Sequence, residues 1–522
     1  MKALLQALAL AAALAASPLP ARPAPATTAA AERPALFYHI FLRSFRDSNG
    51  DRNGDLRGLI ASLDYLQGLG VTTILLTPLY PSAFYHNYFA DDFDGIDPEY
   101  GDMADFRALV ADLHRRGMRI ILDQEIQYVT GQHDWYRSSH DQPNSPVANS
   151  LLYKDKGNHV PVATLLGTND FTIWPNSKQQ IFTVNLAEPR VRTYFTAYLK
   201  RWMDPDQDGD PGDGVDGFRI DHMMDDLDNA GVLTGLLSGF WAPMLADLRR
   251  LNPKIEVIAE QADWGDGAAF FEQGRVNTVF AFPIWKAANA LDASALAAAI
   301  RRSGTLIGPG RDQLVFVENH DTERFAEGAR NTPAIRALGA ALTLLTGWTP
   351  SLYYGQELGM GGKRATDPGG SVDTPDIPLR QAFRWVADPL AAPNAAWYRQ
   401  FPEAYRTPDS QAPGDGVSVA EQDGDRAALL NIYRTLSALR AREPSLARGD
   451  TSVVAQTGDL LLIERRASSH RTRILFNLGA APATLPVPDA DRLADRLYGA
   501  ASRTGTDLTA PPHSATVWAM RP

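Results

Sequence analysis

The sequence contains no cysteine among its 522 residues. This absence excludes disulfide bridges, thiol catalysis, zinc–thiolate sites and a lipid anchored on an N-terminal cysteine. Export remains open, because many bacterial exported proteins contain no disulfides.

Positive charge is also scarce in this chain. Its 50 Lys and Arg residues are outnumbered by 61 Asp and Glu residues, which gives a formal net charge of -11. An acidic chain repels phosphate backbones, so we expect no nucleic-acid partner. A neutral substrate such as a sugar is not disfavoured.

Long apolar runs are rare, and the clearest one lies at the N-terminus. It extends from Leu4 to Ala16, follows the charge of Lys2, and is followed by small residues and prolines. This order predicts a secretory signal peptide over residues 1–26, the alternative being a disordered alanine-rich leader. We therefore expect an exported protein, periplasmic or extracellular. No later segment has 18 uninterrupted apolar residues, so we expect no membrane span, and the sequence leaves the oligomeric state open.

The rest of the chain alternates short apolar strands with amphipathic helices. Strands are expected at Ala35–Phe45, Val71–Thr77, Met118–Glu125, Val215–Asp221, Ile255–Glu260, Val276–Phe282, Gln313–Glu318 and Ser351–Tyr354. Helices are expected between them, among others at Leu56–Leu69, Asp105–Arg116, Val191–Met203 and Phe240–Leu251. Eight strands alternating with helices predict the α/β class and a closed parallel (β/α)8 TIM barrel.

Two segments interrupt this alternation. Residues 128–189 are rich in Asn, Pro, His and Trp and are too long for a simple connection, so we expect a B subdomain inserted after the third strand. Residues 448–522 carry short β runs that predict a C-terminal antiparallel β-sandwich. The barrel is thus expected over residues 33–127 and 190–447.

Three of the expected strands end in an acid: Asp221, Glu260 and Asp321. Any one of them could be a loop cap or a surface charge. Barrel enzymes, however, place catalysis at the C-terminal ends of strands, where these acids would converge and separate one another's pKa values. Retaining glycoside hydrolysis needs such a pair, one carboxylate ionised and one carboxyl protonated. Arg219 lies on the same strand face as Asp221 and would hold it ionised.

Together these strings resemble glycoside hydrolase family 13, the α-amylase family, over nearly all of the expected mature chain. The matching motifs are Gly70–Pro78, Tyr85–Phe89, Ile96–Gly101, Gly217–Asp221, Glu260, Asn319–Asp321 and Tyr353–Glu357. The resemblance implies a barrel with a B domain and a C-terminal β-sandwich. It also implies an α-glucan or maltooligosaccharide as the substrate.

The resemblance assigns roles position by position. Asp221 resembles the nucleophile, Glu260 the general acid and base, and Asp321 the acid that stabilises the transition state. Arg219, His320 and Tyr88 resemble, in turn, the partner of the nucleophile, a hydroxyl-binding donor and the ring on which the sugar stacks.

The implied reaction is retaining hydrolysis of α-glucosidic bonds, and Phe89 weakly favours endo action. Three alternatives remain. The chain could be a glucosyltransferase, an exo-α-glucosidase or sucrose-type enzyme, or a non-catalytic glycan-binding homologue.

The third strand departs from the family pattern. Where the family has Asp-x-x-x-Asn-His, this chain has Asp123 followed by Gln127 and Tyr128 at the Asn and His positions. Tyr128 is hypothesised to replace the histidine at the sugar. Thr183 stands where a B-domain acid would complete a calcium site between barrel and B domain. We therefore predict that this interdomain calcium is absent.

A different metal site is indicated after the first strand. The segment Asp47–Asp55 places hard oxygen ligands at alternate positions around glycines, which suits calcium. It resembles the calcium loop of glucosidase-like family members, which implies that Asp47, Asn49, Asp51 and Asp55 bind through side chains and Asn53 through its carbonyl. The alternative is a polar turn that caps the following helix. For Asp204–Asp210, calcium and a solvated turn remain equally open.

Overall fold

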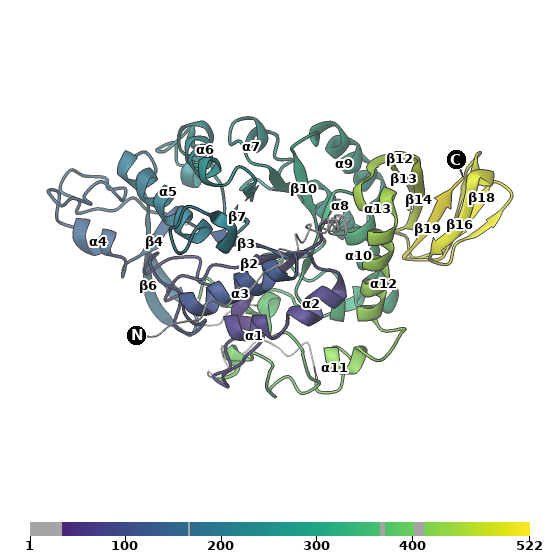
Figure 1. The fold of residues 1–522 in the computed structure, drawn as a ribbon, viewed down its shortest axis with the longest axis horizontal. Coiled ribbons are helices and arrows are strands. Elements are labelled where there is room, and N and C mark those ends of the chain that lie inside the picture. Colours follow the sequence, from purple (N-terminus) through teal and green to yellow (C-terminus); the bar gives the residue numbers. More distant parts are fainter. Residues whose placement is uncertain (1–33, 165–166, 366–370, 401–411, 522) are drawn as a thin grey trace, which may run out of the picture. The chain divides into compact units, whose positions relative to one another are not determined.

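The protein is described by a computed structural model covering residues 34–164, 167–365, 371–400 and 412–521, and the expected signal peptide lies outside this part. Eight parallel strands close into a barrel, each paired with its neighbours in the chain order and the last with the first (Figure 1). The strands are β1 (Phe37–Ile40), β2 (Thr73–Leu76), β3 (Arg119–Gln124), β7 (Gly217–Ile220), β8 (Glu256–Ala259), β9 (Thr278–Phe280), β10 (Asp312–Val315) and β11 (Thr349–Tyr353). The predicted (β/α)8 barrel is confirmed.

The register of these strands positions the catalytic candidates. Alternate residues of a barrel strand point inward, and Phe37, Ile121 and Ile258 belong to one buried cluster contributed by different strands. Two residues further along β3 and β7, the register sets Asp123 beside Arg219. This pair therefore lies one inward-facing layer nearer the C-terminal mouth of the barrel.

Helices surround the strands (Figure 1). The longer ones are α3 (Met103–Arg115), α5 (Pro189–Met203), α6 (Ala242–Leu251), α8 (Phe282–Ala290), α9 (Ala293–Leu306), α10 (Pro333–Leu345) and α12 (Leu429–Arg442). Shorter helices are α1 (Leu56–Ile60), α2 (Leu63–Leu69), α4 (Asp134–Ser139), α7 (Ala268–Glu272), α11 (Val419–Gln422) and α13 (Pro444–Arg448).

Two sequence expectations about local structure were wrong. The strand predicted over Ala35–Phe45 ends at Ile40, because its partner strand ends opposite it at Leu76, and a 3-10 turn, η1 (Leu42–Ser44), follows. The single helix predicted over Leu56–Leu69 is two helices, because the α-helical path is interrupted at Ala61 and Ser62. The apolar spacing is continuous across both breaks, so periodicity could not reveal them.

A small antiparallel sheet follows β3, where the inserted subdomain was expected. The strand order in this sheet is β4 (Tyr128–Thr130), β6 (Ser177–Thr183), β5 (Asp170–Ile173). Between β4 and β6, Tyr128 lies opposite Thr183 and Thr130 lies opposite Ile181. These side chains come from the subdomain but lie next to the barrel mouth.

The C-terminal part is an antiparallel β-sandwich, as predicted. One sheet has the order β12 (Asp450–Thr457), β13 (Leu460–Ala467), β14 (His470–Asn477), β19 (Ser514–Met520), β16 (Leu493–Tyr498). The other has the order β15 (Ala483–Pro486), β18 (Asp507–Ala510), β17 (Ser502–Thr504). Leu462, Leu485 and Trp518 belong to one buried cluster, to which both sheets contribute side chains. Within the described ranges, no helix is both long and apolar enough to cross a bilayer.

Candidate active site

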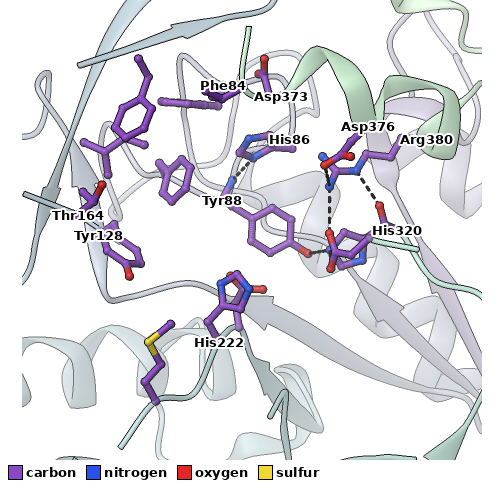
Figure 2. Close-up of a pocket in the computed structure, with 17 residues that line it drawn as sticks. Phe84, His86, Tyr88, Tyr128, Thr164, His222, His320, Asp373, Asp376 and Arg380 are labelled. Atoms are coloured by element: carbon purple, nitrogen blue, oxygen red, sulfur yellow. Dashed lines mark hydrogen bonds and ion pairs between the residues drawn. The ribbon is translucent and has the colours of Figure 1, made fainter. Parts of the chain in front are cut away.

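A cavity opens at the C-terminal mouth of the barrel (Figure 2). At one end its lining is polar, with Tyr88, His86, His320, Asp321, Asp376 and Arg380. At the other end, here called the apolar end, the lining is Phe84, Phe89, Tyr128, Phe171, Ile181 and Met224. Asp221 and His222 also line the cavity, and Figure 2 shows His222 between Tyr128 and His320.

Arg219 joins three carboxyl groups at the base of this cavity. Its Nη1 lies 2.8 Å from Asp123 Oδ1 and also donates to Asp221, and its Nη2 donates to Glu260 Oε2 at 2.7 Å. Arg219 is fully buried, so these bonds are sheltered from water. Because one guanidinium group binds both Asp221 and Glu260, the two carboxyls lie within a few Å of each other, compatible with the ~5–5.5 Å of a retaining glycosidase.

The surroundings give these two acids different protonation. Burial opposes the ionisation of Asp221, but the positive charges of His222 and Arg219 hold its pKa below the ordinary value. Burial raises the pKa of Glu260 to about 7, against the opposing pull of Arg219. At neutral pH, Asp221 is therefore ionised while Glu260 keeps a proton in a large fraction of molecules. This is the division of roles that the sequence predicted for them.

Glu260 is nevertheless covered. Its side chain is 1% exposed, and it is not among the residues that line the cavity. The backbone N–H of His222 donates to Glu260 Oε2 at 3.1 Å, in addition to the bond from Arg219. Arg219 and His222 therefore hold Glu260 Oε2 in place at the base of the cavity.

The third predicted acid, Asp321, belongs to the polar end. Its Oδ1 lies 3.0 Å from Arg380 Nη2, and its Oδ2 lies 3.0 Å from His320 Nε2. Tyr88 donates to Asp123 Oδ2 at 2.7 Å, and its ring is stacked on His320 with a centroid distance of 5.3 Å. The structure thus brings Arg219, Tyr88, His320 and the three acids together.

Tyr128 lies away from this polar group. Its hydroxyl donates to Asp228, which also accepts from Thr183 Oγ1 at 3.4 Å. Gln127 Nε2 donates to the backbone oxygen of Asp221 at 3.1 Å. The positions at which the chain departs from the motif it resembles thus form hydrogen bonds between the subdomain and the loop after β7.

Three site residues were missed by sequence reasoning. Arg380, after β11, reaches Asp321 and Asp376, and nothing in its local sequence indicates this contact. His222 lies with its Nδ1 3.3 Å from Asp221 Oδ2, and the charge of Asp221 raises the pKa of His222 to about 8. Glu125 hydrogen-bonds to Asp221. An acid at the end of the third expected strand was the available signal for Glu125.

The loop Asp47–Asp55 is closed by its own carboxylates. Asp47 accepts from the backbone N–H groups of Gly50 and Arg52 at 2.7 and 2.9 Å, and Asp55 caps α1 by accepting from Gly58 N. Asp55 therefore caps the following helix, as the alternative interpretation of this segment expected. Arg43 Nη1 donates a hydrogen bond to the side-chain oxygen of Asn53 at 3.0 Å. The backbone carbonyl of Asn53 therefore remains as its ligand for a metal.

An arginine from α3 contacts the second acidic loop. Oxygen atoms of Asp204, Asp206 and Asp213 lie within 4.8 Å of one another. Arg107 Nη2 lies 3.2 Å from Asp206 and 3.7 Å from Asp213. An arginine therefore already balances part of this charge.

Five large aromatic residues of the loops that follow the barrel strands pack against other rings. Trp135 contacts Phe195, Trp174 contacts Trp397, Tyr136 stacks on Phe182, and Trp385 contacts Phe45. Trp264 is 39% exposed and stacks on Phe282. None of these five rings is among the residues lining the cavity described above.

Comparison with known proteins agrees with this geometry. The family model "Alpha amylase, catalytic domain" matches residues 39–229 and 275–449, and "Domain of unknown function (DUF3459)" matches residues 447–517. "Alpha-amylase 3" of Dictyoglomus thermophilum is 26% identical over 480 residues, covering 89% of this chain and 88% of that protein. A "Probable alpha-glucosidase" of Rhizobium meliloti is 27% identical over 513 residues, covering 87% of this chain and 91% of that protein. The crystal structure of an α-amylase from H. orenii superposes with a TM-score of 0.75 at 23% identity, covering 94% of this chain and 100% of that one, which shows a shared fold.

Proposed function

The chain belongs to the α-amylase family of glycoside hydrolases, and we propose that it cleaves α-glucosidic bonds of α-glucans or maltooligosaccharides by double displacement at Asp221 and Glu260. The observation that carries this proposal is the buried Arg219, whose two terminal nitrogens bind the two carboxyls. The arrangement supplies an ionised oxygen and a protonated neighbour within reach of one bond.

In the first half-reaction, a carboxylate oxygen of Asp221 attacks the anomeric carbon. The bond to the leaving oxygen breaks, and Glu260 gives that oxygen its proton. In the second half-reaction, Glu260 takes a proton from water, the water oxygen attacks the anomeric carbon, and Asp221 is released. Asp221 starts ionised because His222 and Arg219 lower its pKa against the effect of burial.

The polar end of the cavity binds the sugar whose bond is cleaved. Asp321, Arg380 and His320 offer charged and hydrogen-bonding groups for its hydroxyls, and Asp321 stabilises the positive charge that develops on the ring. Tyr88 lines the same end and supplies an aromatic wall.

Turnover of maltoheptaose by the wild type and by Asp221→Asn tests the proposal. Hydrolysis by the wild type that is abolished in a folded Asp221→Asn variant is the expected result. Absence of hydrolysis by both folded proteins would instead favour a non-catalytic glycan-binding function.

Exo action is a second candidate, favoured by an ion-paired wall at the polar end. There Arg380 contacts both Asp321 and Asp376, and Arg364 Nε lies 2.7 Å from Asp376. A long glucan continuing past this wall would have to break these pairs, so the wall favours a terminal sugar. Release of glucose alone from maltoheptaose would indicate exo action, mixed oligosaccharides endo action, and longer products glucosyl transfer.

Calcium at Asp47–Asp55 is part of the proposal. Asp47, Asn49, Asp51 and Asp55 would hold the ion by side-chain oxygens and Asn53 by its carbonyl, and the ion would stabilise the loop. In support, no Lys or Arg lies within 4 Å of the carboxylates of Asp47, Asp51 and Asp55 among the ion pairs of the described residues. The donors that contact them there are backbone N–H groups and uncharged side chains. Export through a signal peptide at residues 1–26 is likewise proposed, and N-terminal sequencing of the secreted protein would test it.

A further inference from the structure

His222 directly follows the proposed nucleophile in the chain and contacts both catalytic acids. Its ring Nδ1 lies 3.3 Å from Asp221 Oδ2, and its backbone N–H donates to Glu260 Oε2 at 3.1 Å. Its φ of 39° is positive, a backbone conformation that few residues other than glycine adopt and that persists where the surrounding structure enforces it. His222 is therefore held through both its side chain and its backbone beside the bond that is cleaved.

Within the described part of the chain, the second ring nitrogen of His222 has no partner. Nδ1 faces Asp221, and none of the described hydrogen bonds or ion pairs involves Nε2. The side chain is 48% exposed and lines the cavity. The charge of Asp221 raises the pKa of His222 to about 8, so at neutral pH both ring nitrogens carry a hydrogen in most molecules. Nε2 is therefore available to donate to a molecule in the cavity.

The place of His222 in the cavity indicates which part of the substrate it meets. Figure 2 shows His222 between His320, at the polar end, and Tyr128, at the apolar end. The polar end is proposed to hold the sugar whose bond is cleaved, with its anomeric carbon at Asp221. The next glucose of the chain, across the scissile bond, therefore lies beside His222 and faces the apolar end.

The other groups on this side of the cavity suit a sugar. Phe89 meets Tyr128 edge to face at 5.9 Å and Phe84 at 4.9 Å, which offers apolar surface to the C–H face of a pyranose ring. Beside Phe84 lies Asp373, a buried cavity-lining residue whose Oδ2 has no hydrogen-bond partner among the described residues. A glucose unit brings hydroxyls that donate and accept, whereas a methyl aglycone brings none. Because a polar group left unpaired in a closed site is costly, these groups favour a second sugar.

From this geometry we infer that His222 Nε2 donates to a hydroxyl of the glucose on the leaving side of the scissile bond. This contact makes His222 a specificity-determining residue, which favours a second sugar over a simple alcohol at that position. The inference rests on the proposed double displacement, in which Glu260 remains the group that protonates the leaving oxygen.

The test compares maltose with methyl α-glucoside, which place the same glucose at the polar end and differ only across the scissile bond. Replacing His222 also removes a charge next to Asp221, but this change acts on both substrates. The ratio of their kcat/KM values, maltose over methyl α-glucoside, therefore reports contacts with the second sugar. We expect His222→Leu to lower this ratio by about tenfold or more, the effect of losing one hydrogen bond from a charged donor. His222→Gln, which keeps a neutral donor, should lower it less.

The pH dependence of this ratio gives a second readout. Because the carboxylate of Asp221 keeps a hydrogen on Nδ1, deprotonation of His222 removes the hydrogen from Nε2. The wild-type ratio should therefore fall as the pH rises through the pKa of about 8, and the ratio of His222→Leu should stay flat. The other titratable or charged groups around His222 are Glu125, Glu260, Asp321 and Arg219. They act on both substrates alike, so their titration cancels in the ratio.

His470→Leu is the matched control. His470 is exposed at the start of β14 in the C-terminal sandwich and does not line the cavity, so its substitution should leave both kcat/KM values unchanged. Circular dichroism and a thermal scan establish that each variant is folded, and His222→Gln supplies the comparison if the leucine variant does not fold. Cleavage of maltose with a ratio unchanged in the folded variants would overturn the inference alone. No cleavage of maltoheptaose, maltose or methyl α-glucoside by the wild type would overturn the proposed function with it.

Discussion

Glu125 hydrogen-bonds to Asp221 across the ends of two neighbouring barrel strands, although both side chains are acids. Glu125 is fully buried, and its oxygens also accept from the backbone and side-chain N–H groups of Gln127. Two carboxyl groups in such contact cannot both be ionised, so they hold one proton between them. Because His222 and Arg219 favour the charged form of Asp221, the proton resides on Glu125.

Glu125→Gln is expected to gain stability relative to the wild type as the pH rises. Burial and the charge of Asp221 raise the pKa of Glu125 well above 4.5, so the folded protein keeps a proton that the unfolded chain releases. The free energy of unfolding of the wild type therefore falls as the pH rises above the pKa that Glu125 has in the unfolded chain. Glutamine removes this loss because it has no proton to release. Between pH 5 and pH 8 the difference in free energy of unfolding should grow by about 1 kcal/mol or more, measured by denaturant titration.

The exposed Glu323 provides the control for this measurement. Glu323→Gln should follow the wild-type curve at both pH values. Parallel wild-type and Glu125→Gln curves would show that Glu125 is ionised in the folded protein at neutral pH.

Activity on alkyl glucosides is expected to decline above pH 7. Burial raises the pKa of Glu260 to about 7, and its proton is needed by the leaving oxygen. Glu260→Gln should lower kcat/KM for methyl α-glucoside by roughly 10²–10⁴-fold and remove this basic limb. The loss should be much smaller for 4-nitrophenyl α-glucoside, whose leaving group needs little protonation. Equal losses for both substrates would assign the proton to another group.

How far sequence alone could anticipate the site depends on where each residue lies along the chain. Asp221, Glu260 and Asp321 could be nominated because the first two directly follow strands and the third lies in the segment after β10, and strand ends in a parallel barrel converge at one mouth. Arg380 could not, because its loop follows β11 and only the folded loop brings it to Asp321. The bond between Tyr128 and Asp228 spans 100 residues and two loops, beyond the reach of strand periodicity. For Glu125 the unusual acid was visible, but its partner follows only from the register of β3 and β7.

Tyr128→Phe is expected to act mainly on stability. Its hydroxyl hydrogen is donated to Asp228, so it is not free to bind a sugar. Losing a hydrogen bond to a charged acceptor should cost about 1–3 kcal/mol in the free energy of unfolding. Tyr153→Phe, which removes a bond to the neutral hydroxyl of Ser139 at 2.7 Å in the same subdomain, should cost less. A large fall in kcat for Tyr128→Phe at unchanged stability would instead place the hydroxyl on the substrate.

Calcium is expected to stabilise the protein through the loop after β1. Asp51 is exposed and its carboxylate contacts only the loop itself among the described hydrogen bonds, so a bound ion would add the missing positive charge. At a free calcium concentration 100 times the Kd, the free energy of unfolding should rise by about 2.7 kcal/mol over the chelated protein. Asp51→Ala should abolish this increment, whereas Asp204→Ala should preserve it, because Arg107 already balances the second acidic loop. Thermal unfolding with and without chelator measures both. An increment that survives Asp51→Ala and disappears in Asp204→Ala would move the ion to the second loop.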